Sequence, residues 1–130
     1  MSWLYPDRGD FIAVVGRMQD INAVRQVKAA LLSSRDLSVY SMNAPWFIPG
    51  IDFSDHLNYW QHDIPAVMIT DTAFYRNKQY HLPGDTADRL NYQKMAQMVL
   101  QPCYTTVNNK NFSRRVQKQR HVHFIFPRLF

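Results

Sequence analysis

The loop from Thr70 to Thr86 contains residues whose side chains could do chemistry. Its sequence, TDTAFYRNKQYHLPGDT, is dense in Asp, Tyr, Arg, Asn and His. The neutral imidazole of His81 could bind zinc, and the phenol of Tyr80 could donate a hydrogen bond to a developing oxyanion. Arg76 and Asn77 could contact a polar group of a substrate. The residues alone leave two alternatives open: a surface histidine at His81 and a packing ring at Tyr80.

A second group, Ser54-Asp55-His56, has the composition of a catalytic triad. Adjacent residues cannot form the relay, because the triad needs side chains that converge in space. The pattern therefore favours a helix cap followed by a buried, hydrogen-bonded histidine. Asp71 could hold a ligand or simply be a turn residue, and we expect Asp85 or Thr86 to begin the last helix.

The charge of the chain lies mostly in its last thirty residues. Residues 1–100 carry a net charge of −1, and residues 101–130 carry +6 with no acidic residue. A basic tail can bind phosphates nonspecifically, but a solvated tail explains the composition equally well. Nucleic acid is therefore not the expected partner. His121 and His123 are spaced to share one strand face, but no carboxylate or cysteine lies near them, so no metal site is expected there.

Several protein classes are excluded by composition. The chain has no apolar run of about 18 residues that could span a membrane, and its start lacks the pattern of a signal peptide. With 46% apolar residues it is not expected to be disordered. A single cysteine, Cys103, excludes an internal disulfide and a cysteine-based zinc site within one chain.

The candidate residues need an α/β framework to position them. Apolar, β-branched runs predict buried strands at Phe11–Gly16 and Ile64–Thr70, and a short strand at 46–49. Ser33 to Asn43 is polar and predicts a loop. Three helices are also expected. The first is capped by Asp20 and has its apolar side at Ile21, Val24, Val27, Ala30 and Leu31. The second begins at Ser54 or Asp55 and runs to Trp60, and the third begins at Asp85 or Thr86 with its apolar side at Leu90, Met95, Ala96 and Val99.

This alternation predicts a sheet with helices on its faces, and ligands at the carboxyl ends of its strands. The loops after Asp52 and after Thr70 are the expected ends. Beyond Leu100 the helical pattern fails at Pro102, so residues 101–130 are expected to form a basic tail, disordered or unrelated to the rest.

Four segments resemble the carboxyl-terminal part of the co-catalytic zinc aminopeptidases of the bacterial leucyl aminopeptidase type: GDFIAVVG, FSDHLNYW, IPAVMITDTAFYRN and YHLPGDTADRLNYQKMAQMV. The resemblance runs in order over about residues 8 to 99. It implies a mixed, mostly parallel sheet with helices on both faces, a zinc ligand at His81 and an oxyanion-stabilising phenol at Tyr80. It also implies a substrate pocket near Ser54, Asp55, His56, Tyr59 and Trp60.

The same resemblance implies that the site is incomplete. The family uses two zinc ions, further ligands from earlier in the chain and a glutamate base, whereas this chain has no Glu and no His before His56. Leu82 and Gly84 also depart from the motif around His81. Residues 1–100 are therefore expected to be the carboxyl-terminal half of a peptide-hydrolysing catalytic domain, inactive alone. Truncation, a split gene or a fragmentary gene prediction would each produce such a chain.

Two other functions stay open. The half-domain could be an interaction module that pairs with a separately encoded first half or with a second copy of itself. The basic tail could bind nucleic acid, which we rank last. Complete members of the resembled family are often exported, but the sequence does not indicate a compartment for this chain.

Overall fold

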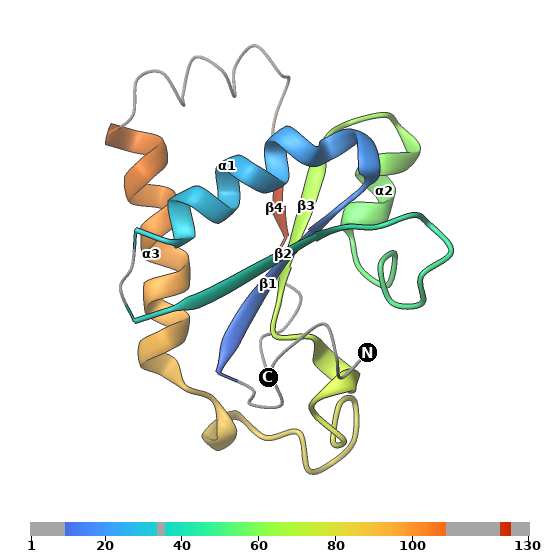
Figure 1. Ribbon diagram of the computed structural model, residues 1–130. Helices are drawn as coiled ribbons and strands as arrows, with labels where there is room; N and C mark the ends of the chain where they lie inside the picture. The colour runs from blue at the N-terminus through green and yellow to red at the C-terminus, as the bar shows by residue number, and fades with distance from the viewer. Residues whose placement is uncertain (1–9, 34–35, 109–122, 126–130) are drawn as a thin grey trace.

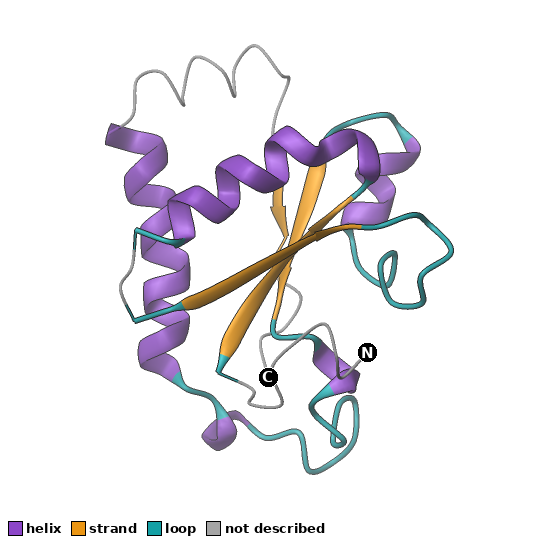
Figure 2. Ribbon diagram, viewed as in Figure 1, coloured by secondary structure: helices purple, strands orange, loops and turns teal. Residues whose placement is uncertain are grey.

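The computed structural model describes residues 10–33, 36–108 and 123–125, which form a mixed sheet with helices on both faces (Figures 1 and 2). The strands lie in the order β2-β1-β3-β4. β1 pairs in parallel with β2 and antiparallel with β3, and β3 pairs in parallel with β4. The α/β prediction is confirmed at this level. The strand bounds are Phe11–Gly16 for β1, Ser38–Asn43 for β2, Ala66–Thr70 for β3 and His123–Ile125 for β4.

One face of the sheet is covered by α1 (Ile21–Leu31), against which α3 (Tyr92–Asn108) packs. The predicted apolar period of α1 is confirmed at four of its five positions, and only Ile21 faces solvent. The core on this face has side chains from three strands and both helices: Val14, Val24, Val27, Leu31, Val39, Val67, Ile69 and Met98. Every residue of β3 is buried, as expected for a strand covered on both faces.

The other face is covered by α2 (His56–Gln61) and by the segment Ala44–Asp55. Its core is smaller and is built from Phe11, Ala13, Val15, Ala44, Ile51 and Met68, with Met42, Ile48 and Trp60 partly buried against them. The Trp60 indole donates a hydrogen bond to the carbonyl oxygen of Ala66 at 3.0 Å. This bond fixes α2 beside the first residue of β3.

Two predictions between α1 and α2 are wrong. The segment expected to be a loop, Ser33 to Asn43, contains β2, and the strand expected at 46–49 is a turn. β2 is at one end of the sheet order, so only one of its six residues is buried and its composition is mostly polar. Trp46 and Phe47 are apolar but face solvent, so their apolar character does not indicate a buried strand.

The last helix also differs from its prediction. A short 3-10 turn (Ala87–Arg89) follows Thr86, and α3 begins at Tyr92, where the Asn91 side-chain oxygen accepts a hydrogen bond from the Lys94 N–H at 3.0 Å. Asn91 is therefore the cap, and Asp85 and Thr86 are not.

α3 presents a different face to the core than expected. Its core contact is Met98, whereas Met95, Ala96 and Val99 are exposed, and Leu90 precedes the helix. α3 also continues through Pro102 to Asn108, although an interior proline removes one N–H from the helical ladder and crowds the preceding turn; the predicted failure of the helix at Pro102 is therefore wrong. The division of the chain at residue 100 stays a prediction. Residues 109–122, including His121, lie outside the described residues, as do the side chains of Cys103 and His123.

The expected acidic caps of the first two helices are also wrong. Asp20 and Asp55 occupy the N-cap positions, but neither side chain makes a capping hydrogen bond. Asp20 is buried and instead pairs with Arg17, whose Nε lies 2.7 Å from its Oδ2. Arg17 also donates to the carbonyl oxygen of Trp60 at 3.1 Å, so this ion pair links the end of β1 to α2.

Candidate functional site

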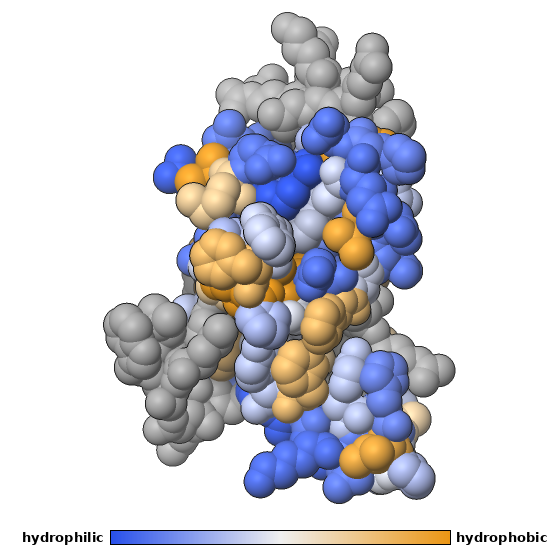
Figure 3. Space-filling view, turned by 90° about the vertical axis from the view of Figure 1, so that its right-hand side faces the viewer, coloured by the Kyte–Doolittle hydropathy of each residue, from blue (hydrophilic) through white to orange (hydrophobic). Residues whose placement is uncertain are grey.

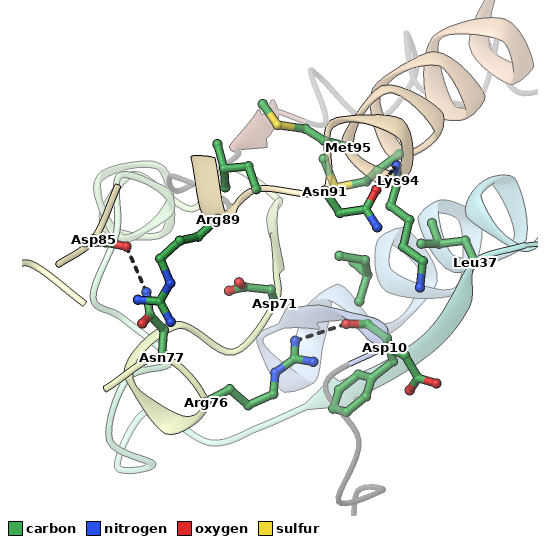
Figure 4. Close-up of a pocket in the computed structure, with 14 residues that line it drawn as sticks. Asp10, Leu37, Asp71, Arg76, Asn77, Asp85, Arg89, Asn91, Lys94 and Met95 are labelled. Atoms are coloured by element: carbon green, nitrogen blue, oxygen red, sulfur yellow. Dashed lines mark hydrogen bonds between the residues drawn. The ribbon is translucent and has the colours of Figure 1, made fainter. Parts of the chain in front are cut away.

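A pocket of about 320 Å³ lies beyond the end of β3 (Figure 4). Because β3 is antiparallel to β1, its last residue is beside the start of β1, and the loop after β3 meets the residues before β1 and β2. α3 closes the opposite wall. The pocket is lined by charged and amide side chains over an apolar floor: Asp10, Asp71, Arg76, Asn77, Asp85, Arg89, Asn91 and Lys94, with Phe11, Ile12, Leu37, Leu90, Met95 and Met98.

Arg76 holds the loop after β3 against β1. Its Nε donates to the Thr72 hydroxyl at 2.7 Å, and its Nη2 donates to the carbonyl oxygen of Phe11 at 3.0 Å. The guanidinium also lies 4.4 Å from the centre of the Phe11 ring, a cation–π contact. These contacts use much of the donor capacity of Arg76, so its first role is to position the loop.

Asp71 lies in the pocket with one oxygen engaged. Its Oδ1 accepts a hydrogen bond from the Ala73 N–H at 2.9 Å, which forms the turn after β3. Burial raises the pKa of Asp71 above its ordinary value, and the hydrogen bond from Ala73 and the charge of Arg76 only partly oppose this rise. The carboxylate is therefore short of positive partners.

Asp85 organises the loop that contains His81. Its Oδ1 accepts a hydrogen bond from the Asn77 amide at 2.8 Å, and its Oδ2 accepts one from the His81 backbone N–H at 3.4 Å. His81 has a φ of 60°, a left-handed conformation that is uncommon for residues other than glycine. Asp85 thus stabilises the turn and does not cap a helix.

Tyr80 and His81 do not line the pocket. Their rings contact each other at a tilt of 56° with centroids 4.0 Å apart, and the Phe74 ring lies 6.2 Å from that of Tyr80. The His81 side chain is exposed. The loop therefore separates its predicted residues: Arg76 and Asn77 line the pocket, while Tyr80 and His81 stand outside it beside other aromatic rings.

These rings border a wider apolar area, which we call the aromatic surface. It consists of Trp46, Phe47, Phe53, Phe74 and Tyr75, which are respectively 84%, 67%, 67%, 41% and 52% exposed. Phe53 and Phe74 have ring centroids 6.2 Å apart, and the Tyr75 hydroxyl donates to the carbonyl oxygen of Pro49 at 3.0 Å. Figure 3 shows apolar residues gathered across the middle of the side that includes α2 and the Ala44–Asp55 segment.

The residues expected in a substrate pocket around α2 lie elsewhere. Ser54, Asp55, His56, Tyr59 and Trp60 do not line the pocket beyond β3. His56 is fully buried against Trp60, and its Nε2 hydrogen-bonds the carbonyl oxygen of Ile51. Burial lowers the pKa of His56 below its ordinary value. The buried, hydrogen-bonded histidine predicted from the sequence is confirmed.

Four pocket residues were missed by sequence reasoning: Asp10, Arg89, Asn91 and Lys94. The antiparallel placement of β3 brings Asp10 to the pocket, and no local pattern in the sequence indicates that pairing. Lys94 belongs to the last predicted helix, but its local sequence does not indicate that it reaches the end of β3.

The described residues do not fit a zinc site. Among them, no three His, Cys, Asp or Glu side chains come together as a possible metal-binding group, whereas a catalytic zinc needs about three protein ligands. His81 has no such companions in this part of the chain. The described helices also include none that is long and apolar enough to cross a membrane.

The fold and site define an α/β segment with a small polar pocket, and no family model or solved structure matches the chain. Among curated proteins, the chain is 94% identical over 99 residues to "Uncharacterized protein YfbL" of Escherichia coli (strain K12). The match covers 76% of this chain but 31% of that protein, so the chain spans about a third of the length of the curated relative it matches.

These comparisons contradict the assignment to the zinc aminopeptidases. No family model supports it, and the name of the relative, which shares nearly all of the aligned residues, indicates no activity. Short motifs that resemble those of a family do not establish membership in it, and the assignment is withdrawn.

Proposed function

We propose that this chain is one part of a larger α/β domain and acts as an interaction module. Its partner is the part of the longer relative that lies outside the match. The exposed aromatic surface is the observation that supports the proposal most directly. Single exposed apolar residues are ordinary on a protein surface, whereas large ones that gather together favour an interaction site. Here the Trp46 ring contacts Phe47, and the Phe74 ring contacts Phe53 and Tyr75.

The two faces of the sheet differ in how well they are covered. α1 and α3 cover one face, and a core of ten buried residues lies between these helices and the sheet. On the other face, the six-residue helix α2 covers the start of β3, and the remaining cover comes from the Ala44–Asp55 segment, whose own Trp46, Phe47 and Phe53 are exposed. A further element packed on this side would bury these rings.

α3 supplies a second, independent observation. Ala96 and Val99, which were expected to face the core, are exposed, and so is Tyr92, while Met95 lines the pocket beyond β3. A helix that is apolar on two sides is typical of a position between two packed elements. α3 contacts α1 on one side, and the other side is available to a partner.

The length of the relative supports this choice of partner. At 94% identity the matched region has the same fold, and roughly two thirds of the relative lies outside the match. That additional sequence is a ready source of elements that would cover the aromatic surface. We therefore assign the surface to contact with it, rather than with a second copy of this chain.

Co-expression tests the proposal. This chain would be produced together with the unmatched part of the E. coli relative, with an affinity tag on that part only. We expect the two polypeptides to copurify as a complex with one copy of each, and the complex to resist dissociation in high salt because the contact is apolar. Absence of a complex, or a homodimer of this chain that excludes the second polypeptide, would refute the proposal.

Matched variants locate the contact. Replacing Trp46, Phe47 and Phe53 together by Ser should abolish copurification without unfolding the chain, since these side chains are largely exposed. Met18→Ser with Leu32→Ser removes exposed apolar side chains that lie outside the aromatic surface. This control variant should bind normally.

Zinc-dependent hydrolysis of amino-terminal peptide bonds is a second candidate, for the assembled protein only. It rests on the exposed imidazole of His81, whose ring contacts that of Tyr80. The remaining ligands and a base would have to come from the additional sequence. The complex would be assayed with an aminoacyl anilide and its zinc content measured. Zinc content that is unchanged by His81→Ala would exclude this role for His81.

A further inference from the structure

We propose that the pocket beyond β3 binds a small zwitterion with an aliphatic body, whose cationic group pairs with Asp71 and whose anionic group pairs with Lys94. This inference goes beyond the proposed interaction function, since it uses a different surface of the chain. It rests on the placement of two opposite charges on different walls of one cavity.

Asp71 provides the negative side. Figure 4 shows its carboxylate in the middle of the pocket, where its hydrogen bonds come from the backbone N–H groups of Ala73 and of Asp71 itself. Within the described part of the chain Asp71 makes no ion pair, because the Arg76 guanidinium donates its hydrogen bonds to the Thr72 hydroxyl and the Phe11 carbonyl oxygen. The burial that raises its pKa also strengthens its attraction for a cation that would share the cavity.

Lys94 provides the positive side. It stands in the first turn of α3, and its side chain extends into the pocket from the wall opposite the end of β3 (Figure 4). Its backbone N–H is engaged by Asn91, but its ammonium group has no hydrogen-bond or ion-pair partner among the described residues. The amino-terminal end of α3 adds a favourable field for an anion.

Apolar side chains make up the rest of the pocket lining, among them Leu37, Leu90 and Met98. They would contact a hydrocarbon chain that links the two charges of the ligand. The volume of about 320 Å³ is at the small end of ligand pockets. A small ω-amino carboxylate therefore matches this pocket better than a nucleotide or a peptide of several residues, and 5-aminopentanoate serves as the probe.

Three related probes test the inference on the 130-residue chain. Binding of 5-aminopentanoate, pentanoate and pentylamine would be followed by two-dimensional NMR at low salt. We expect 5-aminopentanoate to saturate with a Kd at least tenfold below those of the two single-charge probes. The largest shifts should be at Asp71, Lys94 and Met98.

Two variants assign the contacts. Asp71→Asn keeps an oxygen for the Ala73 N–H but loses the charge, so 5-aminopentanoate should then bind no better than pentanoate. Lys94→Gln should reduce its affinity to that of pentylamine. Asp88→Asn and Lys78→Gln remove similar charges on residues outside the pocket lining and should leave the affinity unchanged.

Three results would overturn the inference. They are no saturable binding of 5-aminopentanoate, equally strong binding of a single-charge probe, and binding that survives both pocket variants. Because the probes act on the isolated chain, this outcome is independent of whether the chain docks a partner.

Discussion

Gly16 is the position where one added carbon atom should perturb the fold most. It ends β1, and a Cβ built there would lie 2.6 Å from the Val24 Cγ2 of α1. Real Cβ atoms do not approach so closely, so β1 and α1 must separate. Overpacking of this kind costs about 1–3 kcal/mol. For a chain of this length the melting temperature should fall by roughly 3–15 °C.

Urea and thermal unfolding would measure the effect, with Gly84→Ala as the matched control. A Cβ at Gly84 would meet only the side chain of Gln79, which can move, so this variant should lose little stability. Val24→Ala alone should cost about 2 kcal/mol, because Val24 is 1% exposed. In the double variant the alanine at 16 occupies the space vacated at 24, so the combined loss should be smaller than the sum of the two single losses.

Two outcomes would refute the reasoning about Gly16. If Gly16→Ala is no less stable than Gly84→Ala, β1 and α1 are not in close contact. If the losses at 16 and 24 simply add, the clash does not involve Val24, and the packing of α1 on the sheet differs from that described.

Three further predictions concern single side chains. Burial lowers the pKa of His56, so the unfolded state binds a proton at a higher pH than the folded state does. The free energy of unfolding should therefore fall as the pH drops below about 6.5. Urea titrations of His56→Gln should no longer show this dependence. Arg76→Met should cost about 1–3 kcal/mol, because it leaves the Phe11 carbonyl oxygen without its donor; Lys78→Met, the exposed control, should be neutral. Asn91→Ala should cost about 1 kcal/mol by loss of the α3 cap, while Thr86→Ala should be nearly neutral by the same measurement.

The strands that sequence reasoning predicted well are those buried on both faces. β1 and β3 are continuous apolar runs because nearly all of their residues are buried. β2 could not be found in the same way. It lies at one end of the sheet order and alternates one buried valine with polar residues, a composition that a loop shares.

The prediction of which side of α3 faces the core was wrong for a different reason. Its apolar residues were assumed to point to the core, but among the side chains that the structure describes on this helix only Met98 is buried, while Met95 and Val99 are exposed. Periodicity shows that a helix has an apolar side without showing which element covers it. The exposed apolar side of α3 is one of the observations on which the proposed partner rests.

The candidate site was predictable only in part. Arg76 and Asn77 line the pocket as expected of the loop after β3, but Tyr80 and His81 stand outside it. Asp10 and Lys94 enter the pocket through tertiary contacts of β1 and α3. Such long-range pairings leave no local pattern in the sequence, so half of the charged lining could not be foreseen.

The affinity of this chain for the unmatched part of the E. coli relative tests the interaction function most directly. Isothermal titration calorimetry would compare the natural chain with the variant in which Trp46, Phe47 and Phe53 are replaced by Ser. We predict complex formation with a negative heat-capacity change, the sign of buried apolar surface, and a Kd at least tenfold higher for the variant. Equal affinities of the two chains, or no binding by the natural chain, would contradict the proposal.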